Sequence, residues 1–233
     1  MYKYLLPSVL VLGLSACQTT TTTAPQQGVS TQQVASNTQL QSLIDAAWQI
    51  SLDSSPSFAY SLGNKSAAGK LQDLSPATLE ALDQRKQVLL QQLVKIDKNS
   101  LSKEDAINAQ ILQDQLQNDV DQYRYKDHYM PISAEGGFHA YIASIAKGRF
   151  AKVEDYQNYI KQLQALPNYF EQQIYWLKQG LASGITPAKA TLKDFETSIT
   201  AFIVPVEDSG YFKPFTQYPS HFTEAEKAQL TQQ

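Results

Sequence analysis

Apolar residues recur every three or four positions along most of this chain from Leu40 onward, which is the spacing of one face of an α-helix. Strand patterns are nearly absent, because the only β-branched run, residues 199–206, overlaps a stronger helical pattern. The sequence therefore predicts a mainly α fold, an antiparallel, bundle-like array of about six helices with no significant sheet. The apolar stripes are clearest in residues 40–48, 79–96, 107–123 and 153–181.

Several short motifs predict where helices begin. Ser-Pro pairs at residues 55–56 and 75–76 provide a capping residue followed by a proline that suits the first helical position. Residues 102–105 and 223–226 resemble capping boxes, in which a hydroxyl and an acid three residues later satisfy free amides. The second of these boxes opens a helix of only about two turns.

The longest stripe begins near Val153, where Glu154 and Asp155 are adjacent carboxylates. They are interpreted as favourable charges at a helix start rather than as an acid–base pair, because neighbouring positions on a helix face different ways. Pro167 is expected to kink or break this helix. A further helix with inward apolar residues is predicted between residues 187 and 204, and residues 127–150 are expected to be irregular.

The first seventeen residues have the organisation of a lipoprotein signal peptide. A positive residue, Lys3, precedes an apolar stretch of about ten residues, which is too short to span a bilayer. Residues 14–17, Leu-Ser-Ala-Cys, match the lipobox, so we expect residues 1–16 to be removed and Cys17 to carry lipid, palmitate included. An ordinary signal peptide with a chance cysteine is the alternative, but Cys17 is the only cysteine in the chain.

The residues that follow indicate how the domain is held. Residues 17–38 are rich in Thr and Gln and are predicted to form a flexible tether. Gln18 is similar to the default signal for the outer membrane, so the expected location is the cell envelope, facing the periplasm. Loss of Lys3 changes the formal charge from −3 to −4, which argues against nucleic acid as a partner.

Few residues suggest chemistry. The three histidines, His128, His139 and His221, form no His-Glu-x-x-His motif, and a metal site built from His128, His139 and Glu135 is disfavoured against ordinary packed or surface histidines. No nucleophile elbow or phosphate-binding loop occurs. No catalytic, cofactor-binding or metal residue is therefore predicted, and Cys17 is the only functional site.

Aromatic residues gather in two stretches. They could line a ligand cleft or fill the core beneath irregular loops, and packing is the favoured interpretation. The first stretch contains Tyr123, Tyr125, Tyr129, Phe138 and Tyr141, and the second contains Tyr211, Phe212, Phe215 and Tyr218.

Four segments together resemble the N-terminal half of the domain-of-unknown-function 885 family, with the resemblance covering roughly residues 40–230. The most telling one is VEDYQNYIKQLQALPNYFEQQIYWLKQGLASGITPAK, residues 153–189; the others are SPSFAYSLG (55–63), LQDLSPATLEAL (71–82) and LVKIDKNSLSKEDAINAQILQDQL (93–116). The resemblance implies an all-helical, often lipid-anchored bacterial protein related to zinc metallopeptidases.

In such relatives the zinc ligands and the catalytic Glu lie in a C-terminal half, and no position here matches them. Residues 39–233 are therefore expected to be an incomplete helical lobe that is inactive alone, with a peptide substrate or the missing half as partner and zinc only in a longer relative. The alternative is a complete, non-enzymatic helical lipoprotein that binds a cell-envelope partner. The sequence leaves the oligomeric state open.

Overall fold

The computed structural model describes residues 31–133 and 136–232, and within them the mainly α prediction is confirmed. These residues form eight α-helices, rather than about six, and one small hairpin. The helices are α1 (Thr31–Ser54), α2 (Pro56–Ser61), α3 (Pro76–Leu93), α4 (Lys103–Arg124), α5 (Phe138–Ile142), α6 (Val153–Ser183), α7 (Phe195–Thr200) and α8 (Glu224–Thr231). The signal peptide, Cys17 and residues 18–30 lie outside the described residues.

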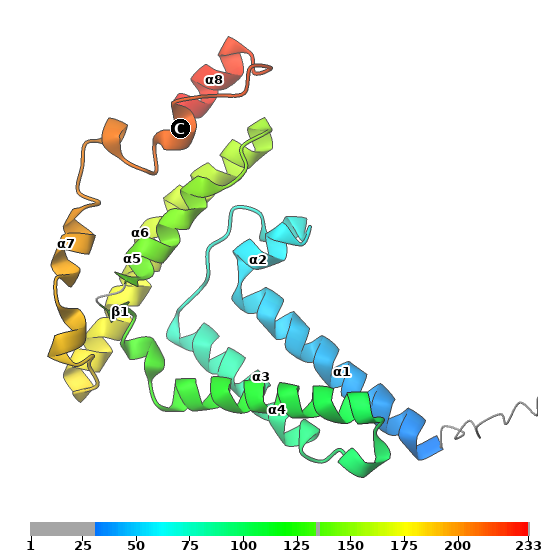
Figure 1. Cartoon of the computed structure of the whole chain (residues 1–233). Coiled ribbons are helices and arrows are strands. Elements are labelled where there is room, and N and C mark those ends of the chain that lie inside the picture. Colours follow the sequence, from blue (N-terminus) through cyan, green and yellow to red (C-terminus); the bar gives the residue numbers. More distant parts are fainter. Residues whose placement is uncertain (1–30, 134–135, 233) are drawn as a thin grey trace, which may run out of the picture.

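Helices α1, α3 and α4 pack together and form the N-terminal region of the molecule (Figure 1). Two of the predicted caps are present, because the Ser75 hydroxyl accepts from the Thr78 amide at 3.4 Å and the Ser102 hydroxyl accepts from the Asp105 amide at 3.0 Å. Ser55, before α2, makes no side-chain capping bond. The buried hydrophobic side chains of this region are all aliphatic: Leu40, Leu43, Ile50, Leu89, Leu93, Ile96, Leu101, Ala109, Leu112 and Leu116.

Helix α1 begins at Thr31, so the last eight residues of the predicted tether, 31–38, are helical. Two causes are visible. Gln and Ala, which are good helix formers, extend the packed helix toward its amino end. The Ser36 hydroxyl also lies 2.7 Å from the Ser100 hydroxyl in the connection between α3 and α4, which holds this end against the bundle. The tether prediction was wrong for these eight residues.

Helix α6 is the spine of the C-terminal region, and its 31 residues correspond to about 46 Å of length. It is continuous through Pro167, contrary to the expected break. Pro167 lies on the exposed side of α6, while Leu166 and Tyr169 remain buried on the other side. Packing on that face keeps the helix whole.

The helix predicted for residues 187–204 is wrong. This segment forms a short 3₁₀ helix, η5 (Lys189–Leu192), followed by α7 (Phe195–Thr200), with Asp194 between them in the left-handed region at φ 61°. The hydroxyl of Ser198 bonds to a nearby backbone carbonyl, an interaction that competes with helix geometry. Ile203, expected to face inward, is 78% exposed.

The stretch between α4 and α6 is irregular, as predicted. It contains the 3₁₀ helix η3 (Asp127–Tyr129) and the antiparallel strands β1 (Ile132–Ser133) and β2 (Gly136–Gly137). Helix α5 and the 3₁₀ helix η4 (Ala143–Lys147) follow. Strands of two residues each agree with the expectation of no significant sheet.

Three features join the two regions. The η3 turn packs against both α4 and α6, where a Cβ on Gly180 would lie only 3.1 Å from the Tyr129 carbonyl oxygen. The Trp176 indole donates to the Leu74 carbonyl at 2.7 Å. The Gln172 side chain accepts from the Leu74 amide and donates to Asp73. The segment before α3 is therefore fastened to the middle of α6.

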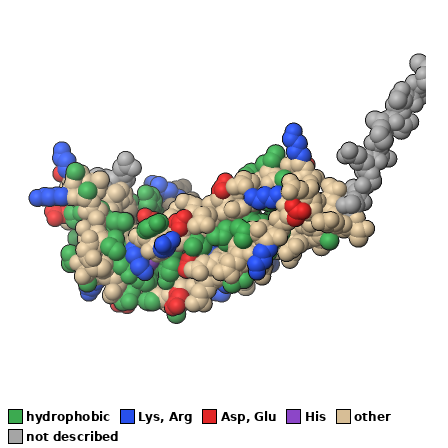
Figure 2. Space-filling model, turned by 90° about the horizontal axis from the view of Figure 1, so that it is seen from below, with side chains coloured by type: hydrophobic (Ala, Val, Ile, Leu, Met, Phe, Trp, Pro, Cys, Tyr) green, Lys and Arg blue, Asp and Glu red, His purple; other side chains and the backbone are tan. Residues whose placement is uncertain are grey.

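Large apolar side chains also reach the surface, some of them at positions that the sequence pattern predicted to face inward. Figure 2 shows hydrophobic groups on one face of the molecule, between scattered acidic and basic ones. Trp48, Ile107 and Ile111 are each about half exposed, at 50%, 54% and 51%. In residues 31–133 and 136–232, no helix combines the length and the apolar character needed to cross a bilayer.

Candidate binding cleft

A cleft of about 740 Å³ lies between the segment from α2 to Gly69 and the amino-terminal part of α6. The α2 side contributes two serines, Tyr60 and Gly69, and the opposite side comes from the η4 segment and the first turns of α6. Since the two sides are 75 or more residues apart in sequence, the cleft exists only in the folded chain. The residues used below are Tyr60, Ile145, Arg149, Phe150, Lys152, Asp155, Asn158, Tyr159 and Gln162.

Local sequence features bring the α2 side close to α6. Asn64 accepts from the Ser66 amide at 3.1 Å and turns the chain after α2 into the 3₁₀ helix η1 (Lys65–Ala67). Gly69 then adopts a φ of +71°, and a Cβ at this position would lie 2.9 Å from the Lys161 Cβ. Glycine is required here for both reasons, since it tolerates positive φ and allows the close approach to α6.

Asn158 and Tyr159 are buried on α6, 7% and 2% exposed respectively. The Asn158 amide donates to the Tyr60 hydroxyl at 3.4 Å, which is a long bond across the cleft. The Tyr159 hydroxyl donates to the Tyr211 carbonyl at 2.8 Å. Burial raises the pKa of Tyr159, so its hydroxyl stays protonated and works as a donor.

The charges at this cleft are predominantly positive. Arg149 and Lys152 line it and are exposed, and neither forms an ion pair among residues 31–133 and 136–232. Asp155 also lines the cleft, but its Oδ2 accepts from the amides of Ala151 and Lys152, each at 2.8 Å. This carboxylate therefore caps α6, as the sequence predicted for the helix start. The cleft offers donors and cations for binding and contains no histidine.

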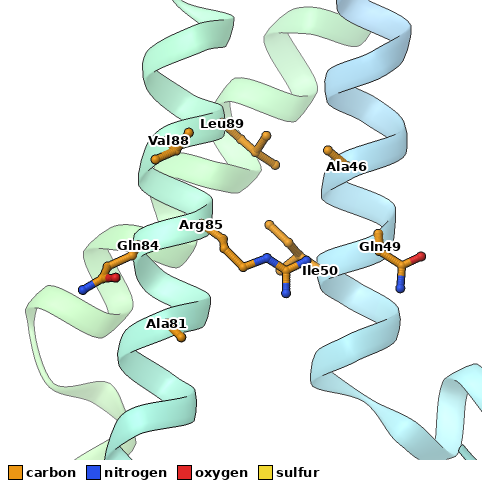
Figure 3. Close-up of a pocket in the computed structure, with 8 residues that line it drawn as sticks. All are labelled: Ala46, Gln49, Ile50, Ala81, Gln84, Arg85, Val88 and Leu89. Atoms are coloured by element: carbon orange, nitrogen blue, oxygen red, sulfur yellow. The ribbon is translucent and has the colours of Figure 1, made fainter.

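A second hollow of about 580 Å³ lies between α1 and α3 (Figure 3). Ala46, Ile50, Val88 and Leu89 make it apolar, and the Arg85 side chain extends across it from α3 toward α1. The Arg85 guanidinium ends 2.8 Å from Asp53.

The Asp53–Arg85 pair is partly exposed, with side chains 41% and 45% accessible. Burial acts to raise the pKa of Asp53, but hydrogen bonds from Gln49 and Arg85 and the Arg85 charge outweigh it, so the pKa is lowered. A pair this exposed contributes little to stability. The hollow presents one already-paired cation and few free polar groups, so it is a weaker site candidate than the cleft beside α6.

The histidines lie in different surroundings. His128 stacks on Tyr123 and packs edge-on against Trp176, whereas His139 contacts Phe138 and Phe202, and His221 bonds through Nε2 to the Ala151 carbonyl at 3.1 Å. Glu135 lies outside the described residues. Within the described part of the chain, no group of three His, Cys, Asp or Glu residues is arranged to hold a metal ion.

His139 and Ser198 form a pair that could be mistaken for a nucleophile and its base. The His139 Nε2 lies 2.9 Å from the Ser198 hydroxyl, but that hydroxyl donates to the Phe195 carbonyl at 2.6 Å. The histidine therefore donates and the serine accepts, opposite to the polarity that activates a serine. Burial lowers the pKa of His139, and its Nδ1 is buried without a partner in the described residues.

The second aromatic stretch packs, as the favoured interpretation held. Phe215 and Tyr218 contact the buried Tyr156, together with Phe222. The first stretch divides: Phe138 is buried, while Tyr125 and Tyr141 are 68% and 70% exposed.

The sequence patterns did not predict the cleft residues. The available signal was the pair of cations, Arg149 and Lys152, flanking an aromatic residue just before a helix start.

Comparison with known proteins gives one match. The profile of a family described as bacterial protein of unknown function (DUF885) matches residues 56–233. No curated protein and no solved structure shows a significant match to this chain. The matched range begins at the first residue of α2 and includes both sides of the cleft.

Proposed function

Because this chain belongs to the DUF885 family of bacterial proteins, we propose that it is a lipid-anchored envelope protein whose helical domain is the substrate-facing lobe of a peptidase-like protein. The observation that carries the proposal is the family match over residues 56–233, which agrees with the resemblance noted in the sequence. The cleft beside α6 supports it, since small-molecule and peptide sites are concave, largely apolar and furnished with a few polar groups.

The anchor is lipid on Cys17, and the support for it is the lipobox at residues 14–17. The lipid on Cys17 would supply three acyl chains, and stable anchoring requires only about two lipid signals. Cells fed labelled palmitate should label the wild-type chain, and the Cys17→Ser variant should carry no label and leave the membrane fraction. Density-gradient separation should place the labelled protein in the outer membrane, and Gln18→Asp should move it to the inner one. Label retained by Cys17→Ser would contradict the proposal.

The lobe is inactive on its own, because the 233 residues contain no His-Glu-x-x-His motif to supply zinc ligands and a base. The purified chain with added zinc should cleave no fluorogenic peptide library above a buffer control. Zinc content measured by atomic emission should stay well below one ion per chain. One zinc per chain together with peptide hydrolysis would overturn this part of the proposal.

A second candidate is a non-enzymatic lipoprotein that binds a partner in the cell envelope. A binding protein would gather its exposed apolar side chains in one bounded patch, whereas exposed apolar groups on several helices, such as Trp48 on α1, Ile111 on α4 and Leu181 on α6, favour the lobe. The purified chain decides between the two: a monomer with one sharp thermal transition favours the binding protein, and a molten, aggregating chain favours the lobe.

A further inference from the structure

We propose that the cleft beside the amino end of α6 binds a small molecule that carries a carboxylate next to an apolar group, with Arg149 and Lys152 receiving the carboxylate. The proposal goes beyond the lipid anchor and the peptidase-like lobe, because it assigns a ligand class to residues of this chain and needs neither zinc nor hydrolysis. Four observations lead to it: the positive charge around the cleft, the spare bonding capacity of the Asn158 side-chain amide, the apolar walls of the cleft and its volume.

The charge around the cleft is opposite to that of the whole chain. The segments that form its two sides, residues 56–70 and 144–162, contain six basic residues and two acidic ones, in a chain of formal charge −3. None of the six cations is in an ion pair among the described residues. Asp155, the one acidic residue lining the cleft, is held by two backbone amides. An anion entering the cleft therefore meets free cations.

Asn158 provides a buried polar group with spare bonding capacity. An amide side chain has two donor hydrogens and two acceptor lone pairs. Asn158 is 7% exposed, yet in the described residues its side chain makes a single bond, at 3.4 Å to Tyr60. A fully buried polar atom normally has a partner. The Asn158 oxygen is not among the described side-chain atoms that are buried without one, so it remains accessible. Since Asn158 lines the cleft, a ligand with polar atoms is a natural partner for it.

The remaining walls are apolar. Phe150, Tyr159 and Ile145 line the cleft, and the rings of Phe150 and Tyr159 pack edge to face at 5.1 Å. Their positions are fixed by the aromatic core behind them, so an apolar ligand group would meet a preformed surface. The volume of about 740 Å³ lies within the range of small-molecule sites, roughly 300 to 1,000 Å³.

A carboxylate fits better than a phosphate. A guanidinium matches the planar carboxylate with two parallel hydrogen bonds. Lys152 adds a second cation three residues after Arg149. Arg149, Lys152 and Asp155 together give the charged lining of the cleft a net charge of +1, which one carboxylate balances and a dianionic phosphate exceeds.

The test uses isothermal titration calorimetry to measure the binding of three separate ligands to the purified full chain. They are N-acetyl-phenylalanyl-alanine, its C-terminal amide and phenyl phosphate. The free acid should bind at least about tenfold more tightly than the amide. Arg149→Gln and Lys152→Gln should each weaken its binding about fivefold, as expected for exposed charge contacts. Lys178→Gln, an exposed lysine on the same helix away from the cleft, is the matched control and should change nothing. Binding should also weaken at 0.5 M salt because of screening.

Equal binding of the acid and the amide would overturn the proposal, as would equal weakening by Lys178→Gln and Arg149→Gln. Tighter binding of phenyl phosphate than of the acid would also overturn it and would assign the cations to phosphate. Unchanged binding in EDTA would separate this inference from zinc chemistry. Because the measurement records binding alone, its failure would leave the palmitate and hydrolysis tests of the proposed function untouched.

Discussion

The two regions of this molecule are stabilised by different kinds of core. In the N-terminal region, the buried hydrophobic cluster between α1, α3 and α4 consists of ten aliphatic residues and includes no aromatic one. In the C-terminal region, the buried groups along α6 include Tyr156, Tyr159, Tyr169 and Trp176. The first region consists of long, regular helices, whereas the second wraps short helices and loops around a single long one.

The difference shows how side-chain chemistry permits irregular backbone. Aliphatic side chains stabilise only by burial, so they need neighbouring helices with matching stripes. Tyrosine and tryptophan add a polar group that can bond to a loop carbonyl. Tyr159 bonds to the Tyr211 carbonyl and Trp176 to the Leu74 carbonyl, so both fasten non-helical segments to α6.

The most disruptive test of this comparison is Tyr156→Ala. Tyr156 is 1% exposed and contacts four aromatic rings, so its loss should destabilise the C-terminal region by about 4 kcal/mol. Hydrogen exchange should show α8 losing protection while α1, α3 and α4 keep theirs. Tyr156→Phe, which keeps the ring, is the control. Equal loss of protection in both regions would show that the two cores unfold as one.

The converse test is Leu93→Ala, at the most buried position of the aliphatic core. Removing this side chain should cost about 3 kcal/mol, and protection should be lost first in α1, α3 and α4. Ile107→Ala is the control, since Ile107 is 54% exposed on α4 and should cost less than about 0.5 kcal/mol. Urea unfolding followed by circular dichroism measures both. A larger effect from Ile107 would mean that its side chain is buried.

Gly180→Ala tests the junction between the regions. The added Cβ would lie 2.6 Å from the Ile185 carbonyl oxygen and 3.1 Å from that of Tyr129, both backbone atoms that yield poorly. We expect a loss of about 2 kcal/mol, from separation of η3 from α6. Gly184→Ala is the comparison, because a Cβ at position 184 would meet open space and the alanine would be strained only by the φ of +74°. Limited proteolysis should cut the Gly180→Ala chain near residues 125–133. Unchanged proteolysis would contradict the tight junction.

Tyr159→Phe tests whether tyrosine hydroxyl groups hold the loops against α6. It keeps the ring but leaves the Tyr211 carbonyl without its 2.8 Å donor, at a cost of about 1 kcal/mol. Residues around Tyr211 should exchange faster, while the aliphatic region is unaffected. The exposed Tyr125, changed to Phe, should have no effect. If the two variants behave alike, the hydroxyl bond contributes nothing.

The smallest effect is expected from pH, and it should be centred on the C-terminal region and the junction, because α1, α3 and α4 contain no histidine and His128 stacks on Tyr123 at the end of α4. Burial lowers the pKa of His139, and burial together with the Lys126 charge lowers that of His128. A lowered pKa means that stability is complete above the ordinary value of 6.5 and declines as pH falls below it toward the folded-state values.

Urea midpoints at pH 7.5 and 5.5 measure this decline, and His139→Gln should reduce it. A decline of the same size in the protection of α1 and α3 would show that the histidines are not its source.

How much could be predicted from the sequence follows the same division. The starts of α2, α3, α4, α6 and α8 were predictable, because capping residues act on neighbours within one turn. How far the apolar side of each helix is buried was less predictable: Ile107 and Ile111 fit the apolar stripe of α4 but are about half exposed. A stripe shows which side of a helix is apolar, whereas the number of neighbours decides how much of that side is covered.

For the candidate site, no sequence pattern groups the individual residues. Tyr60 and Asn158 are 98 residues apart and meet because Gly69 allows the chain to approach α6. The helical class, the caps and the lipobox at Cys17 are local patterns, so the sequence by itself determined the first two and predicts the third. The unbroken α6, the aromatic core and the cleft depend on contacts between distant segments. Only the tertiary structure decided them, because burial and long-range hydrogen bonds outweigh local preference wherever the two differ.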